Sequence, residues 1–173
     1  MNENEISRLV ESVMGSLNSS SGCTEKHHKC TCLRDISLDM AKSLASKIEA
    51  KAKEIGVNAV VAISNTGARP VLIECMDDSY IASYDVALNK AYTAVSLKMT
   101  TSQLKELSQP GGPLYGIQFT NNGQIVIFGG GEPLKYNGRI IGGLGVSGGS
   151  EEQDTYLASY GASCLAEVIK EFS

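Results

Sequence analysis

The chain has 173 residues, of which 42% are hydrophobic and 20% charged, as expected for one globular domain with a modest extension rather than a disordered protein. The net charge of −4 argues against a nucleic-acid-binding surface, which is usually basic. No apolar run approaches the length of a membrane span, and the N-terminus lacks the pattern of a secretory signal. We therefore expect a cytoplasmic protein whose five cysteines are reduced.

Residues 1–18 have the hydrophobic periodicity of an amphipathic helix. Their apolar side chains recur every three or four positions and would form one continuous stripe. The stripe consists of Ile6, Leu9, Val10, Val13, Met14 and Leu17. A terminal helix packed on its own domain would show the same stripe, but a polar linker follows, so we expect docking into a groove on a partner protein. The charges of this helix are mostly acidic, which disfavours a membrane surface.

Residues 19–36 form a polar linker that concentrates residues able to bind metal. It opens with Ser-Ser-Ser-Gly and has few core-forming side chains. The candidate ligands are Cys23, His27, His28, Cys30 and Cys32, and the two histidines are the only ones in the chain. Their spacing matches no standard zinc pattern. Three interpretations stay open: a linker with incidental thiols, a site for zinc or another soft metal, and a haem-ligating segment.

Residues 37–173 have the pattern of a single α+β domain. The expected elements are a helix at 37–55, strands at 57–64 and 70–76, helices at 80–99 and 101–108, strands at 124–128, 132–136 and 139–146, and a helix at 151–171. Asn137-Gly138 is a strong hairpin signal, and Ser150 with Gln153 predicts a capping box. Because the strands occur in hairpin-linked groups, we expect a mainly antiparallel five-stranded sheet flanked by helices, in the order α-ββ-αα-βββ-α.

Two glycine clusters are candidate cofactor-binding loops. The run from Gly143 to Gly148 matches G-x-G-x-x-G, but only one helix follows, so no βαβ dinucleotide fold can form. The glycines either allow close packing or let backbone N–H groups hold an anionic group at the helix start. The second cluster, 129–133, allows either a wide turn or a close approach to a ligand. The candidate residues are Gly129, Gly130, Gly131, Pro133, Gly143, Gly145 and Gly148.

The domain offers little for hydrolytic catalysis. Residues 37–173 contain no histidine, so a Ser-His-Asp or Cys-His arrangement is hard to build. Cys75 and Cys164 are expected to be small core residues. Lys90 and Lys98, on the helix at 80–99, are expected to face solvent. No catalytic residue is predicted.

Several runs in this domain resemble the GlcG/HbpS family, which includes the C-terminal domain of PduO-type proteins. They are residues 87–94 (ALNKAYTA), 129–134 (GGGEPL) and 138–149 (GRIIGGLGVSGG), with Gln153-Asp154. The resemblance implies an antiparallel sheet flanked by helices, assembly into dimers or octamers, and binding of haem or a related tetrapyrrole; other members are linked to cobalamin metabolism. Haem-binding members generally use an axial histidine. In this chain that role would fall to His27, His28 or a linker cysteine.

Residues 1–18 separately resemble the encapsulation peptides of bacterial microcompartment cargo. The combined hypothesis is a microcompartment-associated protein that binds haem, a corrinoid or a similar small anionic cofactor. It would self-associate and meet shell or cargo proteins in the microcompartment lumen through the stripe of residues 1–18. Two alternatives remain: a non-catalytic oligomeric scaffold or cargo-interaction protein, and an enzyme that processes a cofactor or small metabolite.

Overall fold

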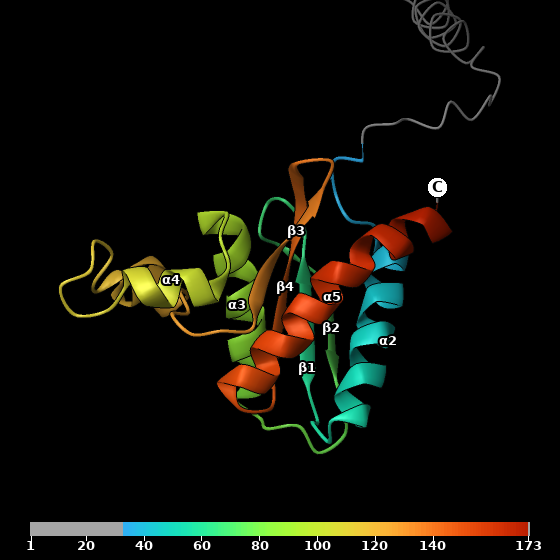
Figure 1. Cartoon of the computed structure of the whole chain (residues 1–173), viewed down its shortest axis with the longest axis horizontal. Helices are drawn as coiled ribbons and strands as arrows, with labels where there is room; N and C mark the ends of the chain where they lie inside the picture. The colour runs from blue at the N-terminus through green and yellow to red at the C-terminus, as the bar shows by residue number, and fades with distance from the viewer. Residues whose placement is uncertain (1–32, 173) are drawn as a thin grey trace, which may run out of the picture. The chain divides into compact units, whose positions relative to one another are not determined.

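The computed structural model describes residues 33–172, so the predicted helix at 1–18 and most of the predicted linker lie outside the described residues. The helices are α2 (Leu38–Glu54), α3 (Ser83–Leu97), α4 (Thr101–Leu107) and α5 (Glu151–Glu171), and the strands are β1 (Val60–Ser64), β2 (Pro70–Cys75), β3 (Gly131–Tyr136) and β4 (Arg139–Ser147). The strands form one antiparallel sheet in the order β2-β1-β4-β3 (Figure 1). None of the helices in this part of the chain is long and apolar enough to cross a membrane.

Helices cover both faces of the sheet. On one face α2 and α5 pack side by side, and their buried aliphatic residues meet Val61 and Ile63 of β1 (Figure 1). On the other face α3 packs directly on β1 and β4, with Ala87 and Ala91 against Val60. All five residues of β1 are buried, because successive side chains of a strand point to opposite faces and both faces are covered.

Local signals set the helix ends. Ser37 caps α2, since Met40 N donates to its Oγ at 3.2 Å. Lys98 takes a left-handed conformation, with φ 57°, and ends α3. The predicted capping box of α5 is present: Gln153 N donates to Ser150 Oγ at 3.3 Å, and Ser150 N donates to Gln153 Oε1 at 2.9 Å.

The predicted strand at 124–128 is wrong. Within residues 33–172 the sheet therefore has four strands instead of five, and the element order is α-ββ-αα-ββ-α. Ile125 and Val126 are buried, which explains the apolar pattern. However, Val126 N donates to Thr93 Oγ1 at 3.0 Å. A side chain of α3 therefore satisfies this amide, and the segment runs beside the helix without joining the sheet.

Candidate functional site

A buried ion pair joins α3 to the first turn of α5, and it corrects the prediction that Lys90 faces solvent. Lys90 is 0% exposed and Asp154 is 4% exposed. Lys90 Nζ donates to Asp154 Oδ2 at 2.7 Å and to Val146 O at 2.8 Å, and it lies 4.9 Å from the centroid of the Phe128 ring. Burial lowers the pKa of Lys90, and the neighbouring Asp154 opposes that shift. Such a buried charge is tolerated because it is fully paired.

The sequence does contain a signal for this pair. Lys90 is three residues after Ala87 and four before Ala94, so it falls on the buried face of α3. Asp154 falls in the first turn of α5, where the positive end of the helix dipole favours a carboxylate.

The cluster 129–131 packs around this ion pair. Gly129 N donates to Glu151 Oε1 at 2.9 Å, and Gly131 N donates to Thr101 Oγ1 at 2.9 Å. Gly130 has φ 106°, and a Cβ added there would lie 2.7 Å from Lys90 Nζ. The bonds from Lys105 and Gly129 hold the pKa of the Glu151 carboxyl below its usual range. This loop is therefore held by α4 and α5.

The glycines of β4 face α3. A Cβ added to Gly143 would lie 2.5 Å from Ala91 O, and one added to Gly145 would lie 2.0 Å from Ala87 O. Pro133, in β3, is buried and pairs with Gly143. Close packing of α3 on the sheet thus accounts for the two glycines, and the role of all three residues in cofactor binding stays a prediction.

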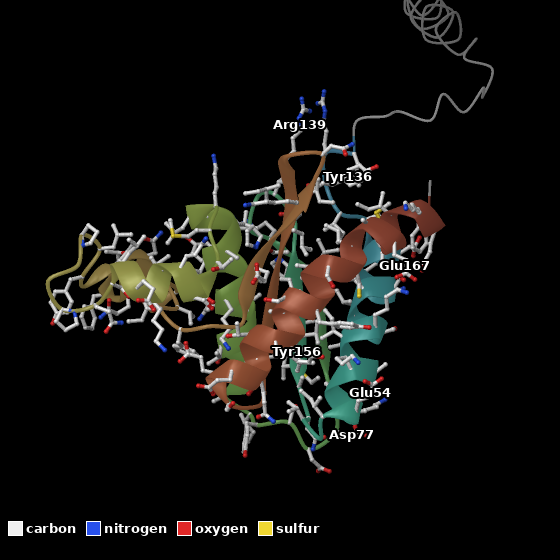
Figure 2. The ribbon with its side chains drawn as sticks, in the orientation of Figure 1. Glu54, Asp77, Tyr136, Arg139, Tyr156 and Glu167 are labelled. Carbon is white, nitrogen blue, oxygen red and sulfur yellow. The ribbon has the colours of Figure 1, made fainter. Side chains whose placement is uncertain are left out.

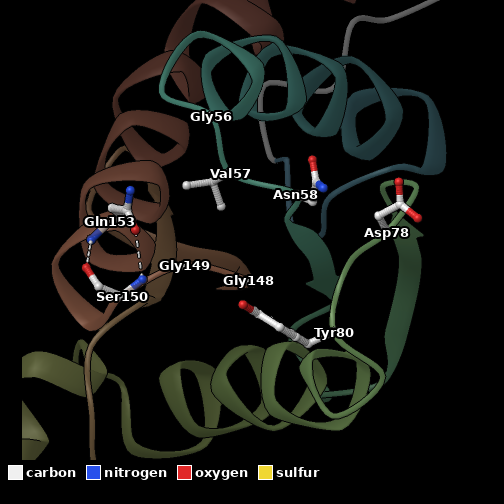
Figure 3. Close-up of a pocket in the computed structure, with 9 residues that line it drawn as sticks. All are labelled: Gly56, Val57, Asn58, Asp78, Tyr80, Gly148, Gly149, Ser150 and Gln153. Atoms are coloured by element: carbon white, nitrogen blue, oxygen red, sulfur yellow. Dashed lines mark hydrogen bonds between the residues drawn. The ribbon is translucent and has the colours of Figure 1, made fainter.

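A depression of about 480 Å³ lies at the end of β4 (Figure 3). Its walls are the turn after α2, the loop before α3 and the start of α5. It is lined by Gly56, Val57, Asn58, Asp78, Tyr80, Gly148, Gly149, Ser150 and Gln153. Of the predicted cofactor-binding residues, Gly148 alone lines it. A Cβ on Gly148 would lie 2.4 Å from Asn58 O, so the glycine lets the strand end close against the neighbouring loop.

The lining of this depression is polar and carries no Lys or Arg side chain. Asn58, Ser150 and Gln153 supply neutral hydrogen-bonding groups, and Asp78 is acidic. Figure 2 shows Asp77 and Glu54 at this end of the domain, with Arg139 at the opposite end. The side chains therefore suit neutral polar groups, and an anion would have only neutral hydrogen-bond donors, without a positive charge, to bind.

A second depression, of about 320 Å³, shares Asn58 with the first. Its lining includes Cys75 and Met76. Cys75 is exposed, which corrects the prediction that it is a core residue, whereas Cys164 is buried. Among residues 33–172 no group of three or more His, Cys, Asp and Glu side chains is placed to hold a metal ion. The predicted ligands Cys23, His27, His28, Cys30 and Cys32 lie outside the described residues.

A tetrapyrrole fits this end of the domain only in part. The polar residues of the larger depression suit the edge of such a ring, and Tyr80, which is 73% exposed, offers an aromatic face beside it. Histidine, cysteine, methionine and tyrosine are the usual protein ligands of haem iron. Of these types, Tyr80 is the one that lines the larger depression.

Comparison with known proteins identifies the family. The family model described as "Haem degrading protein HbpS-like" matches residues 36–163. This chain belongs to the HbpS-like family. The resemblance predicted from the glycine-rich runs is thus confirmed.

Two curated proteins and one solved structure illustrate the relationship. The HbpS-like chain is 45% identical over 141 residues to an uncharacterized 15.0 kDa protein from the dhaT-dhaS intergenic region of Citrobacter freundii, covering 82% of this chain and 99% of that protein. It is 37% identical over 136 residues to the corrinoid adenosyltransferase PduO of Salmonella typhimurium, covering 79% of this chain but 40% of PduO. It also resembles the crystal structure of a PduOC:heme complex, with 36% identity, a TM-score of 0.72, and coverage of 75% of this chain and 94% of that one.

Proposed function

We propose that this HbpS-like domain binds a tetrapyrrole cofactor, haem or a corrinoid, at the depression where Asn58, Tyr80 and the start of α5 meet. The observation that carries the proposal is the convergence of three loops at one end of the sheet, with hydrogen-bonding groups around an exposed aromatic ring. Two relatives support it: one is a PduOC:heme complex and the other is named a corrinoid adenosyltransferase. Because the chain spans 40% of PduO, adenosyltransferase activity is not part of the proposal.

The lining favours a particular way of holding the ring. Carboxamide groups on a corrinoid edge would pair with the amide of Asn58 and the carboxylate of Asp78. The carboxylates of haem would instead need neutral donors such as the Asn58 amide and the Ser150 hydroxyl, because no basic side chain lines the depression and Gly149 N already donates to Asp154 Oδ1. The ring of Tyr80 would stack on the face of a corrinoid. With haem, the Tyr80 hydroxyl would instead be a candidate ligand for the iron, because a ring lying flat on the macrocycle cannot also direct its oxygen at the metal. Bound haem would supply an iron centre for redox chemistry.

Absorption spectroscopy tests this proposal on the full chain. Haem and hydroxocobalamin are titrated separately, and a saturable change in the Soret band or in the corrinoid bands is expected for at least one of them. Tyr80→Ala should weaken binding about tenfold, as loss of a stacking contact of about 1.4 kcal/mol would. Tyr115→Ala is the matched control, because Tyr115 is also exposed, at 65%, but does not line the depression.

The outcomes separate the ligands and the alternatives. A Soret change lost in Tyr80→Phe assigns the iron ligand to Tyr80, whereas one lost when His27 and His28 are both changed to Ala assigns it to the linker. The absence of any change with both cofactors refutes the cofactor proposal. The scaffold alternative would then be favoured if light scattering still shows the expected dimer or octamer.

We also propose that residues 1–18 attach the protein to microcompartment shell or cargo proteins. The stripe and the polar linker that follows support this, since such a helix has an apolar face free to enter a groove. The test compares Leu9→Glu, on the stripe, with Ser12→Glu, on the polar face, in a fluorescently tagged chain expressed with microcompartments. Leu9→Glu should disperse the fluorescence and Ser12→Glu should not. Unchanged localisation of Leu9→Glu refutes the attachment.

A further inference from the structure

The turn at residues 148–150 forms one wall of the depression, and the buried ion pair of Lys90 and Asp154 contacts this turn from inside the domain. Gly149 N donates to Asp154 Oδ1 at 2.9 Å, while Asp154 Oδ2 accepts from Lys90 Nζ at 2.7 Å. Each oxygen of the carboxylate therefore has its own partner. Gly149 itself lines the depression, next to Gly148 and Ser150 (Figure 3).

Lys90 ties this turn to two further segments. Its ammonium donates to Val146 O at 2.8 Å, two residues before Gly148, so it also fixes the end of β4. Val146 N donates to Gly130 O at 2.8 Å, which links the same point to the loop 129–131. One side chain of α3 thus joins the last residues of β4, the glycine loop and the start of α5.

A gain in folding stability does not by itself explain why a charged pair occupies positions 90 and 154. An apolar pair of similar volume often replaces a buried ion pair without loss of stability. An apolar side chain at position 154 could not, however, accept a hydrogen bond from Gly149 N. Without this acceptor, Gly149 N–H would no longer fix the turn at residues 148–150. The turn could then change direction, and the backbone groups that face the depression would move with it.

We propose that Lys90 and Asp154 are positioning residues for the ligand-binding depression, acting by fixing the Gly149 N–H and the end of β4. The inference rests on the proposed cofactor site, since it concerns the wall of that depression. Asp154 contributes the acceptor, and Lys90 orients Asp154 and neutralises its charge. Neither residue lines the depression itself.

The comparison of the Asn and Leu variants keeps charge and approximate volume constant and removes only the acceptor. In a Lys90→Met background, Asp154→Asn retains an oxygen for Gly149 N, whereas Asp154→Leu fills similar space without one. Asp154→Ala in the same background is a second variant that removes the acceptor without requiring room for a branched side chain. Urea unfolding identifies the pair of folded variants with matched stability. Backbone amide exchange and the chemical shift of Gly149, measured by NMR, report on the turn.

Within the Lys90→Met background, the Asn variant should protect the Gly149 amide less than the wild type does, because Lys90 no longer orients residue 154. The Leu or Ala variant should exchange this amide about tenfold faster than the Asn variant. Binding of haem or hydroxocobalamin should weaken about tenfold in parallel, equivalent to about 1.4 kcal/mol. Equal Gly149 protection and equal affinity in the Asn and Leu variants at matched stability would overturn the inference. If the wild-type chain binds neither cofactor, the proposed function fails, and Gly149 exchange alone still decides whether the pair positions the turn.

Discussion

Replacement of Gly145 by Ala tests whether packing explains the glycines of β4. The new Cβ would lie 2.0 Å from Ala87 O and 2.6 Å from Ala91 N, whereas ordinary contact begins near 3.4 Å. Helix α3 would have to retreat by more than 1 Å from the strand, because both obstructing atoms belong to its backbone. Overpacking of a core costs about 1–3 kcal/mol and sometimes more, and contact with backbone places this change at the upper end. Alanine also reduces the entropy of the unfolded chain, which stabilises the folded state by about 0.4–1 kcal/mol. The net decrease in the free energy of unfolding is therefore at least about 2 kcal/mol.

Urea denaturation followed by circular dichroism measures this loss as a lower midpoint at unchanged slope. Gly67→Ala is the matched control, because its nearest obstruction is the Asn65 side chain, at 3.3 Å. The control should stay within about 1 kcal/mol of the wild type. If Gly145→Ala unfolds at the wild-type midpoint, the close approach of α3 to β4 is not what requires glycine there.

Three further predictions concern local contacts. Ser150→Ala removes the cap of α5 and should lower the free energy of unfolding in urea by about 1 kcal/mol. Ser163→Ala removes an exposed hydroxyl within the same helix and should lower it by less than about 0.5 kcal/mol. Equal losses in the two variants would contradict the capping argument. Thr93→Val leaves the buried Val126 N–H without its acceptor and should cost about 1–3 kcal/mol by the same assay, so an unchanged midpoint would mean that this bond adds nothing. Burial raises the pKa of Glu132 above 4.5, so the stability that this carboxyl contributes is full below pH 4.5 and is lost as the pH rises through its folded pKa. The stability of Glu132→Gln relative to the wild type should therefore increase as the pH rises from 4.5 through the folded pKa, and a difference that does not vary with pH would refute this.

Elements with local signals could be predicted closely from the sequence. The last helix runs from Glu151 to Glu171 as predicted, because Ser150 and Gln153 form the capping box expected from their spacing. The hairpin at Asn137-Gly138 also follows from residues that tolerate positive φ; the two have φ 47° and 75°. In both cases the interactions that specify the structure lie within a few residues of one another.

Contacts between distant segments could not be predicted in the same way. The run at 124–128 has the composition of a buried strand, but its amide partner is Thr93, about thirty residues earlier. The burial of Lys90 depends on Asp154, 64 residues away, and the helical period indicates only that Lys90 lies on the apolar face. The position of the depression likewise depends on three loops that meet only in the folded chain.

The glycine contacts between β4 and α3 have a consequence for how such a domain can change its ligand. Where a backbone touches a backbone, no larger residue can be introduced, so this side of the fold offers no room to enlarge or reshape a binding site. The variable part must be the exposed positions Asn58, Asp78 and Tyr80, whose side chains line the depression and do not belong to the core under the sheet. Ligand preference could then diverge among related proteins through a handful of loop substitutions, and engineering of a new specificity should begin at Asn58, Asp78 and Tyr80.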